Sequence, residues 1–269
     1  MWSLMLATLR RGLTTVCVER RLPWRIEQWA QAHTPLRRWQ NARWRARERR
    51  LFRRVIQPGD LVFDIGANVG DKTDAFRHCG ARVIALEPDP RNLDILRPRF
   101  AHDVAVQILP VGAGATCESV PFYRATDHAR STCARDAMVA LDGCRFTDSI
   151  PIALLTLDAL IARYGSPDFV KIDVEGFEPS VLSGLSQPVP LLSFEFHSEL
   201  RAALDACLDR LAAIGMTRFN LLLYPVGNVA SYHPLDRLYF DAPVSRATMR
   251  SVLDRYADRP LAGDVYAFT

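Results

Sequence analysis

The chain has 269 residues, of which 49% are hydrophobic, and it carries a formal net charge of +4. This composition excludes a disordered chain and suits one large α/β domain with an appendage. The charge is uneven, because residues 1–57 hold fourteen Arg against three Glu, whereas the rest holds 20 basic and 27 acidic residues. We therefore expect a basic extension at residues 1–57 and a globular domain at residues 58–269.

The basic extension contains all five tryptophans, interleaved with arginines, and Pro23 and Pro35 divide it into two or three predicted helices. Such a pattern suits nucleic acid or an anionic membrane surface. The simpler interpretation is that its apolar side packs on the domain or on a second subunit while the arginines are solvated. Self-association and a peripheral membrane contact both stay open, and nucleic acid is not expected as a partner.

The six cysteines form no Cys-x-x-Cys pair and no zinc-binding spacing with the histidines. We interpret them as reduced thiols, which favours a cytoplasmic protein. The apolar segment at residues 1–9 is too short to span a bilayer, and no positive residue precedes it as in a secretory signal. Neither export nor a membrane span is therefore expected.

The first predicted strand, residues 61–65, contains Asp64 and leads into a loop with glycines at 66 and 70. Glycine has no Cβ, so the chain can turn tightly there and a ligand can approach the main chain. We expect a buried strand that ends at a ligand, followed by a helix from about Asp71. A purely structural turn would show the same glycine spacing, so the loop alone does not decide.

The second predicted strand, residues 81–86, ends at Glu87 and Pro88. An acid that ends the next strand about 20 residues after a glycine loop is the geometry that holds the two hydroxyls of a ribose. The loop and this acid together predict a nucleotide-like ligand.

The next elements are less regular. Asp89 and Pro90 have the residue types of a helix start, and a third strand at residues 104–109 breaks before Val111 and Gly112. Residues 113–149 show little periodicity apart from a short strand at residues 120–123. A long loop of this kind is usually functional or disordered.

The rest of the chain alternates between predicted helices and strands. The helices are expected at residues 156–164, at residues 175–185 and from residue 198, and the strands at residues 169–173, 188–196, 216–224 and 263–268. Lys171 stands out, because the chain has 32 arginines and only two lysines. This rarity suggests a specific position for its ammonium group.

The motifs together resemble the nucleoside-binding half of the S-adenosylmethionine-dependent methyltransferases, and in particular the FkbM family. The family pattern is Asp-Ile/Val-Gly-Ala-Asn-x-Gly, then Glu-Pro after the second strand, then Lys-Ile-Asp-Val-Glu-Gly-x-Glu. The chain carries these motifs at residues 64–70, 87–88 and 171–178, and the last is the most specific. Asn68, between the two glycines, also separates the loop from the Gly-x-Gly-x-x-Gly pattern of dinucleotide-binding proteins.

The resemblance implies an α/β fold, the Rossmann-like class I methyltransferase sheet of seven strands, mostly parallel with the last strand antiparallel. It also implies S-adenosylmethionine as the cofactor. Cofactor contacts are then expected at Asp64, Gly66, Asn68, Gly70, Glu87, Val111, Gly112 and Asp173. An acceptor-side loop is implied at residues 113–149, with candidate contacts at His128, Arg130, Ser131 and Thr132. An ordinary solvated loop explains these four residues equally well.

Methyl transfer requires the acceptor oxygen to lie in line with the methyl group and to lose its proton. The predicted strand ends bring together four catalytic candidates: Asp173, Glu175, Glu195 and His197. Either His197 or a carboxylate acts as general base, or two of the acids hold a divalent cation that lowers the pKa of the acceptor hydroxyl. We favour the metal-free arrangement and assign no metal ligand.

The leading interpretation is therefore a methyltransferase acting on a hydroxyl of a small-molecule or carbohydrate-like acceptor, and the oxygen preference follows from the resemblance. The alternative is a protein that binds nucleic acid or a membrane surface through the basic extension and has a non-catalytic α/β domain, but the intact motif acids argue against it. A nicotinamide-dependent oxidoreductase is disfavoured by Asn68 and by the absence of a Tyr-x-x-x-Lys pair.

Overall fold

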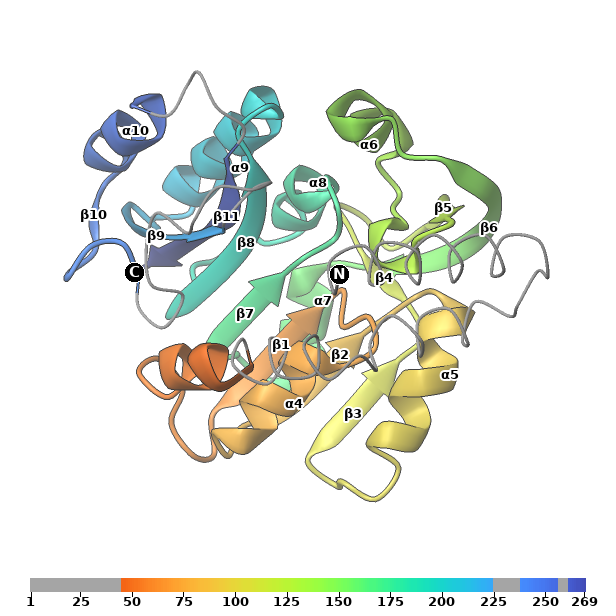
Figure 1. Cartoon of the computed structure of the whole chain (residues 1–269). Coiled ribbons are helices and arrows are strands. Elements are labelled where there is room, and N and C mark those ends of the chain that lie inside the picture. Colours follow the sequence, from red (N-terminus) through yellow and green to blue (C-terminus); the bar gives the residue numbers. More distant parts are fainter. Residues whose placement is uncertain (1–44, 225–237, 256–260) are drawn as a thin grey trace, which may run out of the picture. The chain divides into compact units, whose positions relative to one another are not determined.

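The computed structural model describes residues 45–224, 238–255 and 261–269, so the helices predicted at residues 1–44 lie outside the described residues. Arg47–Thr269 form one compact unit. Its main sheet has eight strands (Figure 1): β1 (Leu61–Ile65), β2 (Arg82–Leu86), β3 (Val106–Leu109), β7 (Phe169–Ile172), β8 (Leu191–His197), β9 (Arg218–Tyr224), β10 (Val244–Ser245) and β11 (Ala262–Phe268). Their order across the sheet is β10-β9-β11-β8-β7-β1-β2-β3.

The five neighbouring strands from β3 to β8 run parallel, and β11 runs antiparallel to both of its neighbours, β8 and β9. The predicted α/β fold, with a mostly parallel sheet and an antiparallel last strand, is therefore confirmed. The two-residue β10 adds an eighth strand beside β9, which the sequence pattern did not predict. Because parallel strands end at the same edge of a sheet, the loops after β1, β2 and β7 meet there.

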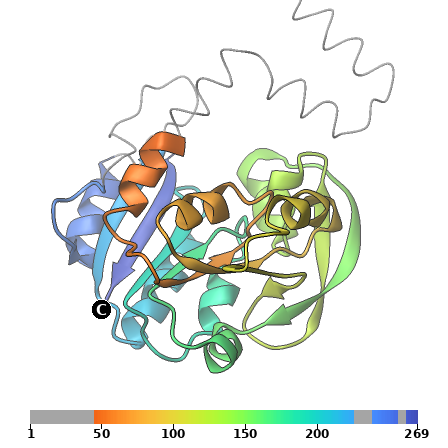
Figure 2. The same ribbon diagram turned by 90° about the horizontal axis from the view of Figure 1, so that it is seen from below.

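Helices cover both faces of this sheet (Figures 1 and 2). One face carries α4 (Asp71–His78) and α5 (Pro90–Arg99), and both helices begin where the sequence predicts. Apolar residues of α7 (Leu157–Tyr164), α8 (Glu178–Ser183), α9 (Arg201–Ala213) and α10 (Arg246–Asp254) form one core with the strands. Among the described residues, no helix is both long enough and apolar enough to cross a membrane.

The segment just before β1 packs on the domain. Leu51, Phe52 and Ile56 are buried, and the Phe52 ring meets the Phe76 ring of α4 edge to face at a centroid distance of 4.8 Å. Such a pair of aromatic rings stabilises a contact beyond the area that it buries. Residues 47–57, which the charge pattern assigns to the basic extension, thus belong to the same compact unit as the main sheet.

Residues 112–155 form a second, smaller sheet rather than the irregular loop expected for most of this stretch. It contains β4 (Gly112–Ala113), β5 (Ser119–Ala125) and β6 (Phe146–Leu155), in the order β4-β6-β5. Between β5 and β6 lie the short 3-10 helix η1 (His128–Arg130) and α6 (Arg135–Asp142). The small core of this sheet consists of Phe122, Ile152 and Leu154. Because so few positions are buried, the strands of this sheet show little alternation of polar and apolar residues in the sequence.

Candidate functional site

The glycine loop after β1 lies directly against the loop after β7. Gly66 has a φ of +84°, and a Cβ added there would come within 1.9 Å of the Asp173 carbonyl oxygen. Asn68 also has a positive φ, of 51°, although it is not a glycine. Only a residue without a Cβ fits at position 66, so this glycine brings the ends of β1 and β7 together.

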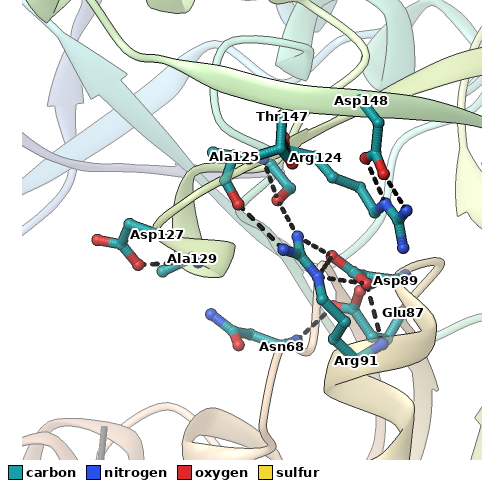
Figure 3. Close-up of polar contacts among 11 residues, drawn as sticks. Asn68, Glu87, Asp89, Arg91, Arg124, Ala125, Asp127, Ala129, Thr147 and Asp148 are labelled. Atoms are coloured by element: carbon teal, nitrogen blue, oxygen red, sulfur yellow. Dashed lines mark hydrogen bonds and ion pairs between the residues drawn. The ribbon is translucent and has the colours of Figure 1, made fainter. Parts of the chain in front are cut away.

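Glu87 ends β2 beside this loop, and its side chain is buried. One carboxylate oxygen accepts a hydrogen bond from the Asn68 backbone N–H (2.8 Å) and the other accepts one from the Asp89 N–H (2.7 Å), as Figure 3 shows in part. Burial raises the pKa of Glu87 to about 7. The Asn92 side chain also bonds to this carboxyl group, which leaves it able to accept a hydrogen bond from one further donor, such as a ligand hydroxyl.

A cavity opens between these loops and the second sheet. Of the expected cofactor contacts, the cavity is lined by Gly66, Asn68, Glu87, Gly112 and Asp173. The other three, Asp64, Gly70 and Val111, do not line it. Asp64 lies underneath the loop, where its buried carboxylate accepts a hydrogen bond from the Thr73 hydroxyl (2.5 Å) and burial raises its pKa to about 6. Its expected contact with the cofactor stays a prediction.

Two amide side chains mark this cavity as a polar site. The side-chain oxygens of Asn68 and Asn92 are buried, and neither has a hydrogen-bond partner among the described residues. Both residues line the cavity next to Glu87. A buried oxygen without a donor is costly, so the pair indicates a ligand with hydroxyl or amino groups at this end. The sequence did not single out Asn92, because a polar residue on a helix is usually solvated.

The second sheet is attached to this site through Arg91 (Figure 3). The Arg91 guanidinium donates to the Asp89 carboxylate (2.6 Å), to the Ala125 carbonyl (3.1 Å) and to the Ser131 hydroxyl (3.0 Å). Of the four loop candidates, His128 and Ser131 line the cavity, whereas Arg130 and Thr132 do not. The Thr132 hydroxyl instead donates to the Val174 carbonyl (3.1 Å).

The four catalytic candidates lie at the ends of β7 and β8. Asp173 and Glu175 line this cavity, while Glu195 and His197 line a second, smaller cavity. The helix that the sequence predicts from residue 175 does not begin at Glu175. Glu175 and Gly176 have left-handed φ angles of 56° and 89°, and α8 starts only at Glu178. This turn is what lets the Glu175 side chain face the end of β8.

One ligand atom each from Glu175, Glu195 and His197 lie within 4.8 Å of one another. Burial and then the Asp173 charge raise the pKa of Glu195 to about 6. Burial lowers the pKa of His197, but the Glu195 carboxylate, 3.7 Å from the imidazole, outweighs this effect and raises it overall. A carboxylate next to an imidazole can orient that imidazole as a proton acceptor.

Residues 64–211, more than half of the chain, match the model of the FkbM methyltransferase domain. The chain belongs to the FkbM methyltransferase family. The family's methyl donor, S-adenosylmethionine, is therefore the implied cofactor.

Two known proteins are similar to parts of this chain. Hexuronic acid methyltransferase AglP of Haloferax volcanii is 27% identical over 159 residues, which are 58% of this chain and 62% of that protein. The chloroplastic ribosomal RNA small subunit methyltransferase of Arabidopsis thaliana is 35% identical over 54 residues, 20% of this chain and 16% of that protein. The chain thus spans less than two thirds of the length of either relative.

Solved structures with similar folds include other methyltransferases. A TehB-like SAM-dependent methyltransferase from Corynebacterium glutamicum is 12% identical, with 92% of this chain and 100% of that chain covered and a TM-score of 0.45. Precorrin-6y C5,15-methyltransferase from Geobacter metallireducens is 13% identical, with 83% and 87% covered and a TM-score of 0.44.

Two buried polar residues, Lys171 and Asp264, form an ion pair next to the site. Lys171 is completely buried and donates to Asp173 (3.3 Å) and to Asp264 of β11 (3.0 Å). Asp264 is separated from Lys171 by 93 positions along the chain, so no local motif connects them. The sequence signal that could have indicated Asp264 is its position as an acid in the otherwise apolar last strand.

Replacing Glu178 with Gln is expected to stabilise the protein by ~2 kcal/mol at pH 8 and by much less at pH 5. Burial and then the Glu195 charge raise the pKa of Glu178 from 4.5 to about 8. The contribution of the Glu178 carboxyl group to the free energy of unfolding is therefore fully present below pH 4.5 and is lost as the pH rises through 8. Gln has no titrating proton, yet its oxygen can still accept the hydrogen bond from the Val174 N–H (3.0 Å). Urea unfolding of both proteins at the two pH values measures the difference, and an identical pH dependence would contradict the assignment.

Proposed function

We propose that this protein transfers the methyl group of S-adenosylmethionine to a hydroxyl of a small-molecule or carbohydrate-like acceptor. The observation that carries the proposal is the cavity at the ends of the parallel strands, with Glu87, Asn68 and Asp173 on its walls. The carbohydrate class is supported by the relative that is named a hexuronic acid methyltransferase. The oxygen preference comes from the family resemblance.

The residues that line the cavity fit this cofactor in their chemistry and in their positions along the cavity. Glu87, with its two carboxylate oxygens, and the unpartnered oxygens of Asn68 and Asn92 would accept hydrogen bonds from the ribose and from the rest of the adenosine. Asp173, on the far side of Gly66, would face the positively charged methionine part. When bound, S-adenosylmethionine supplies an electrophilic methyl group.

The acceptor side is assigned to Glu175, Glu195 and His197. His197 would take the proton of the acceptor hydroxyl, and Glu195 would orient the imidazole and stabilise its positive charge. The raised pKa of His197 suits this role, because a stronger base accepts the proton more readily. Glu175, which lines the cofactor cavity and has a carboxylate oxygen within 4.8 Å of ligand atoms of Glu195 and His197, would hold the acceptor in line with the methyl group.

The metal-free arrangement makes a separate prediction. If His197 is the base, treatment with a strong chelator followed by gel filtration should leave the rate of methyl transfer unchanged within about twofold. If Glu175, Glu195 and His197 instead hold a divalent cation, the rate should fall sharply and return when Mg²⁺ or Mn²⁺ is added. The second outcome would replace the general-base mechanism.

The cofactor assignment is tested by replacing Glu87 with Ala. The affinity for S-adenosylmethionine, measured by calorimetry, is expected to fall by ~1 to 3 kcal/mol, because charge-assisted hydrogen bonds to the ribose are lost. Glu118→Ala is a matched control, since Glu118 is exposed and does not line the cavity. Equal affinity in the Glu87→Ala protein and its control would remove the ribose assignment.

A further inference from the structure

The two lysines of the chain lie in one charged group beneath the cofactor loop. Lys72 of α4 pairs with Glu48, and Lys171 of β7 pairs with Asp173 and Asp264. All the other basic residues apart from histidine are arginines, 32 in number. The use of lysine only here indicates that the group requires the shape of an ammonium ion.

Lys171 meets three acceptors with the three hydrogens of its ammonium group. These acceptors are the Ile172 carbonyl (3.2 Å), the Asp173 carboxylate (3.3 Å) and the Asp264 carboxylate (3.0 Å). An arginine offers five donors on a larger planar fork, and the Lys171 side chain has no exposed surface into which such a fork could extend. The site is therefore matched to a compact cation.

The strand register explains how Asp264 reaches this lysine. Lys171 lies opposite Ser193 of β8, and Asp264 of β11 lies opposite Glu195 of the same strand. Directly opposed residues of neighbouring strands point to the same face of a sheet, and so do residues two positions apart in one strand, such as Ser193 and Glu195. Lys171, Glu195 and Asp264 therefore share one face of the sheet. Burial alone would lower the pKa of Lys171, but the charges of Asp173, Asp264 and Glu195 outweigh burial and raise it well above its usual value.

Charge explains why a second acid is present. Lys171 alone would cancel the negative charge of Asp173, and the cavity wall would then be neutral at this point. With Asp264 on the other side of the ammonium group, the three residues keep one net negative charge. Of Lys171, Asp173 and Asp264, only Asp173 lines the cavity.

We propose that Lys171 and Asp264 are positioning residues for the cofactor: Asp264 anchors Lys171, and Lys171 holds a still negative Asp173 carboxylate toward the cationic methionine part. This inference rests on the proposed function. It adds a residue of the last strand, outside the segment that matches the family model, to the cofactor site.

The test compares three ligands that differ in the methionine part. The ligands differ in their positively charged groups. S-Adenosylmethionine has a sulfonium and an ammonium group, S-adenosylhomocysteine has the ammonium group alone, and 5′-methylthioadenosine has neither. Dissociation constants are measured by calorimetry for the full chain and for Asp264→Asn. The substitution keeps the shape and an acceptor oxygen for Lys171, but it makes the set of Lys171, Asp173 and Asp264 neutral.

The proposal predicts that Asp264→Asn weakens S-adenosylmethionine and S-adenosylhomocysteine about tenfold while methylthioadenosine changes by less than about twofold. Asp264→Glu, which keeps the charge, should bind more tightly than Asp264→Asn. Asp168→Asn is the control, because it makes the same chemical change at the opposite end of β7, where Asp168 accepts a hydrogen bond from the Leu61 N–H.

Equal affinities in wild type and Asp264→Asn, or an equal loss for all three ligands, would overturn the proposal. So would an Asp264→Asn protein that cannot fold, because Asp264 would then be a structural residue. If the wild-type protein binds none of the three ligands, the proposed function itself is wrong, which is a different result from failure of the variant alone.

Discussion

Replacing Asp173 with Asn is expected to lower methyl transfer by ~100-fold or more while the domain stays folded. Asp173 lines the cavity at the end of β7, and the change removes its negative charge but keeps its shape. Lys171 retains its bond to Asp264 (3.0 Å), so no buried charge is left unpaired and the domain should stay folded. Single-turnover transfer of a labelled methyl group and thermal melting measure the two effects.

The control for this variant is again Asp168→Asn. If Asp173→Asn unfolds readily and its remaining folded fraction transfers methyl groups at the normal rate, Asp173 is a structural acid. The catalytic group at the ends of β7 and β8 would then be wrongly placed.

Replacing Gly66 with Ala is expected to destabilise the domain by ~3 kcal/mol or more and to abolish cofactor binding. The new Cβ would lie 1.9 Å from the Asp173 carbonyl oxygen and 2.9 Å from its carbonyl carbon. Both atoms belong to the backbone, so the ends of β1 and β7 would have to move apart. The φ of +84° adds conformational strain for any residue with a Cβ.

Gly59→Ala separates these two causes. Gly59 has a φ of +96° but no atom within 4 Å of the added Cβ, so only the conformational cost of ~1 to 2 kcal/mol applies. Urea unfolding of both variants gives the comparison. Equal losses would mean that the contact between the β1 and β7 loops does not constrain position 66.

The cofactor side of the site could be predicted from the sequence because each part is local. The motif from Asp64 to Gly70 spans the end of β1 and its connection to α4, and Glu87 follows β2 directly, so strand ends and glycines are enough to locate both. The parallel sheet then brings both to one edge. Asp264 could not be predicted, because its contact with Lys171 reaches across β8 from the last strand.

Three other features were predicted only in part or not at all, for physical reasons. Of β5 only residues 120–123 were predicted as a strand, because β5 buries only Phe122 and Ala125 and its sequence therefore lacks the alternation of a strand with one face in a core. The turn at Glu175 uses a left-handed φ at a residue that is not glycine, which composition does not reveal. Asn92 is a buried polar residue on α5, and its spacing does not distinguish it from a solvated position.

The central claim is that the cavity beside Glu87 and Asp173 holds S-adenosylmethionine and directs its methyl group to an acceptor hydroxyl. The most direct test is mass spectrometry of the products after incubation of the protein with methyl-labelled cofactor and an extract of its own host. The account predicts one labelled product class, with the methyl group on oxygen, that disappears with Asp173→Asn. Absence of any labelled product, or equal labelling by wild type and Asp173→Asn, would contradict it.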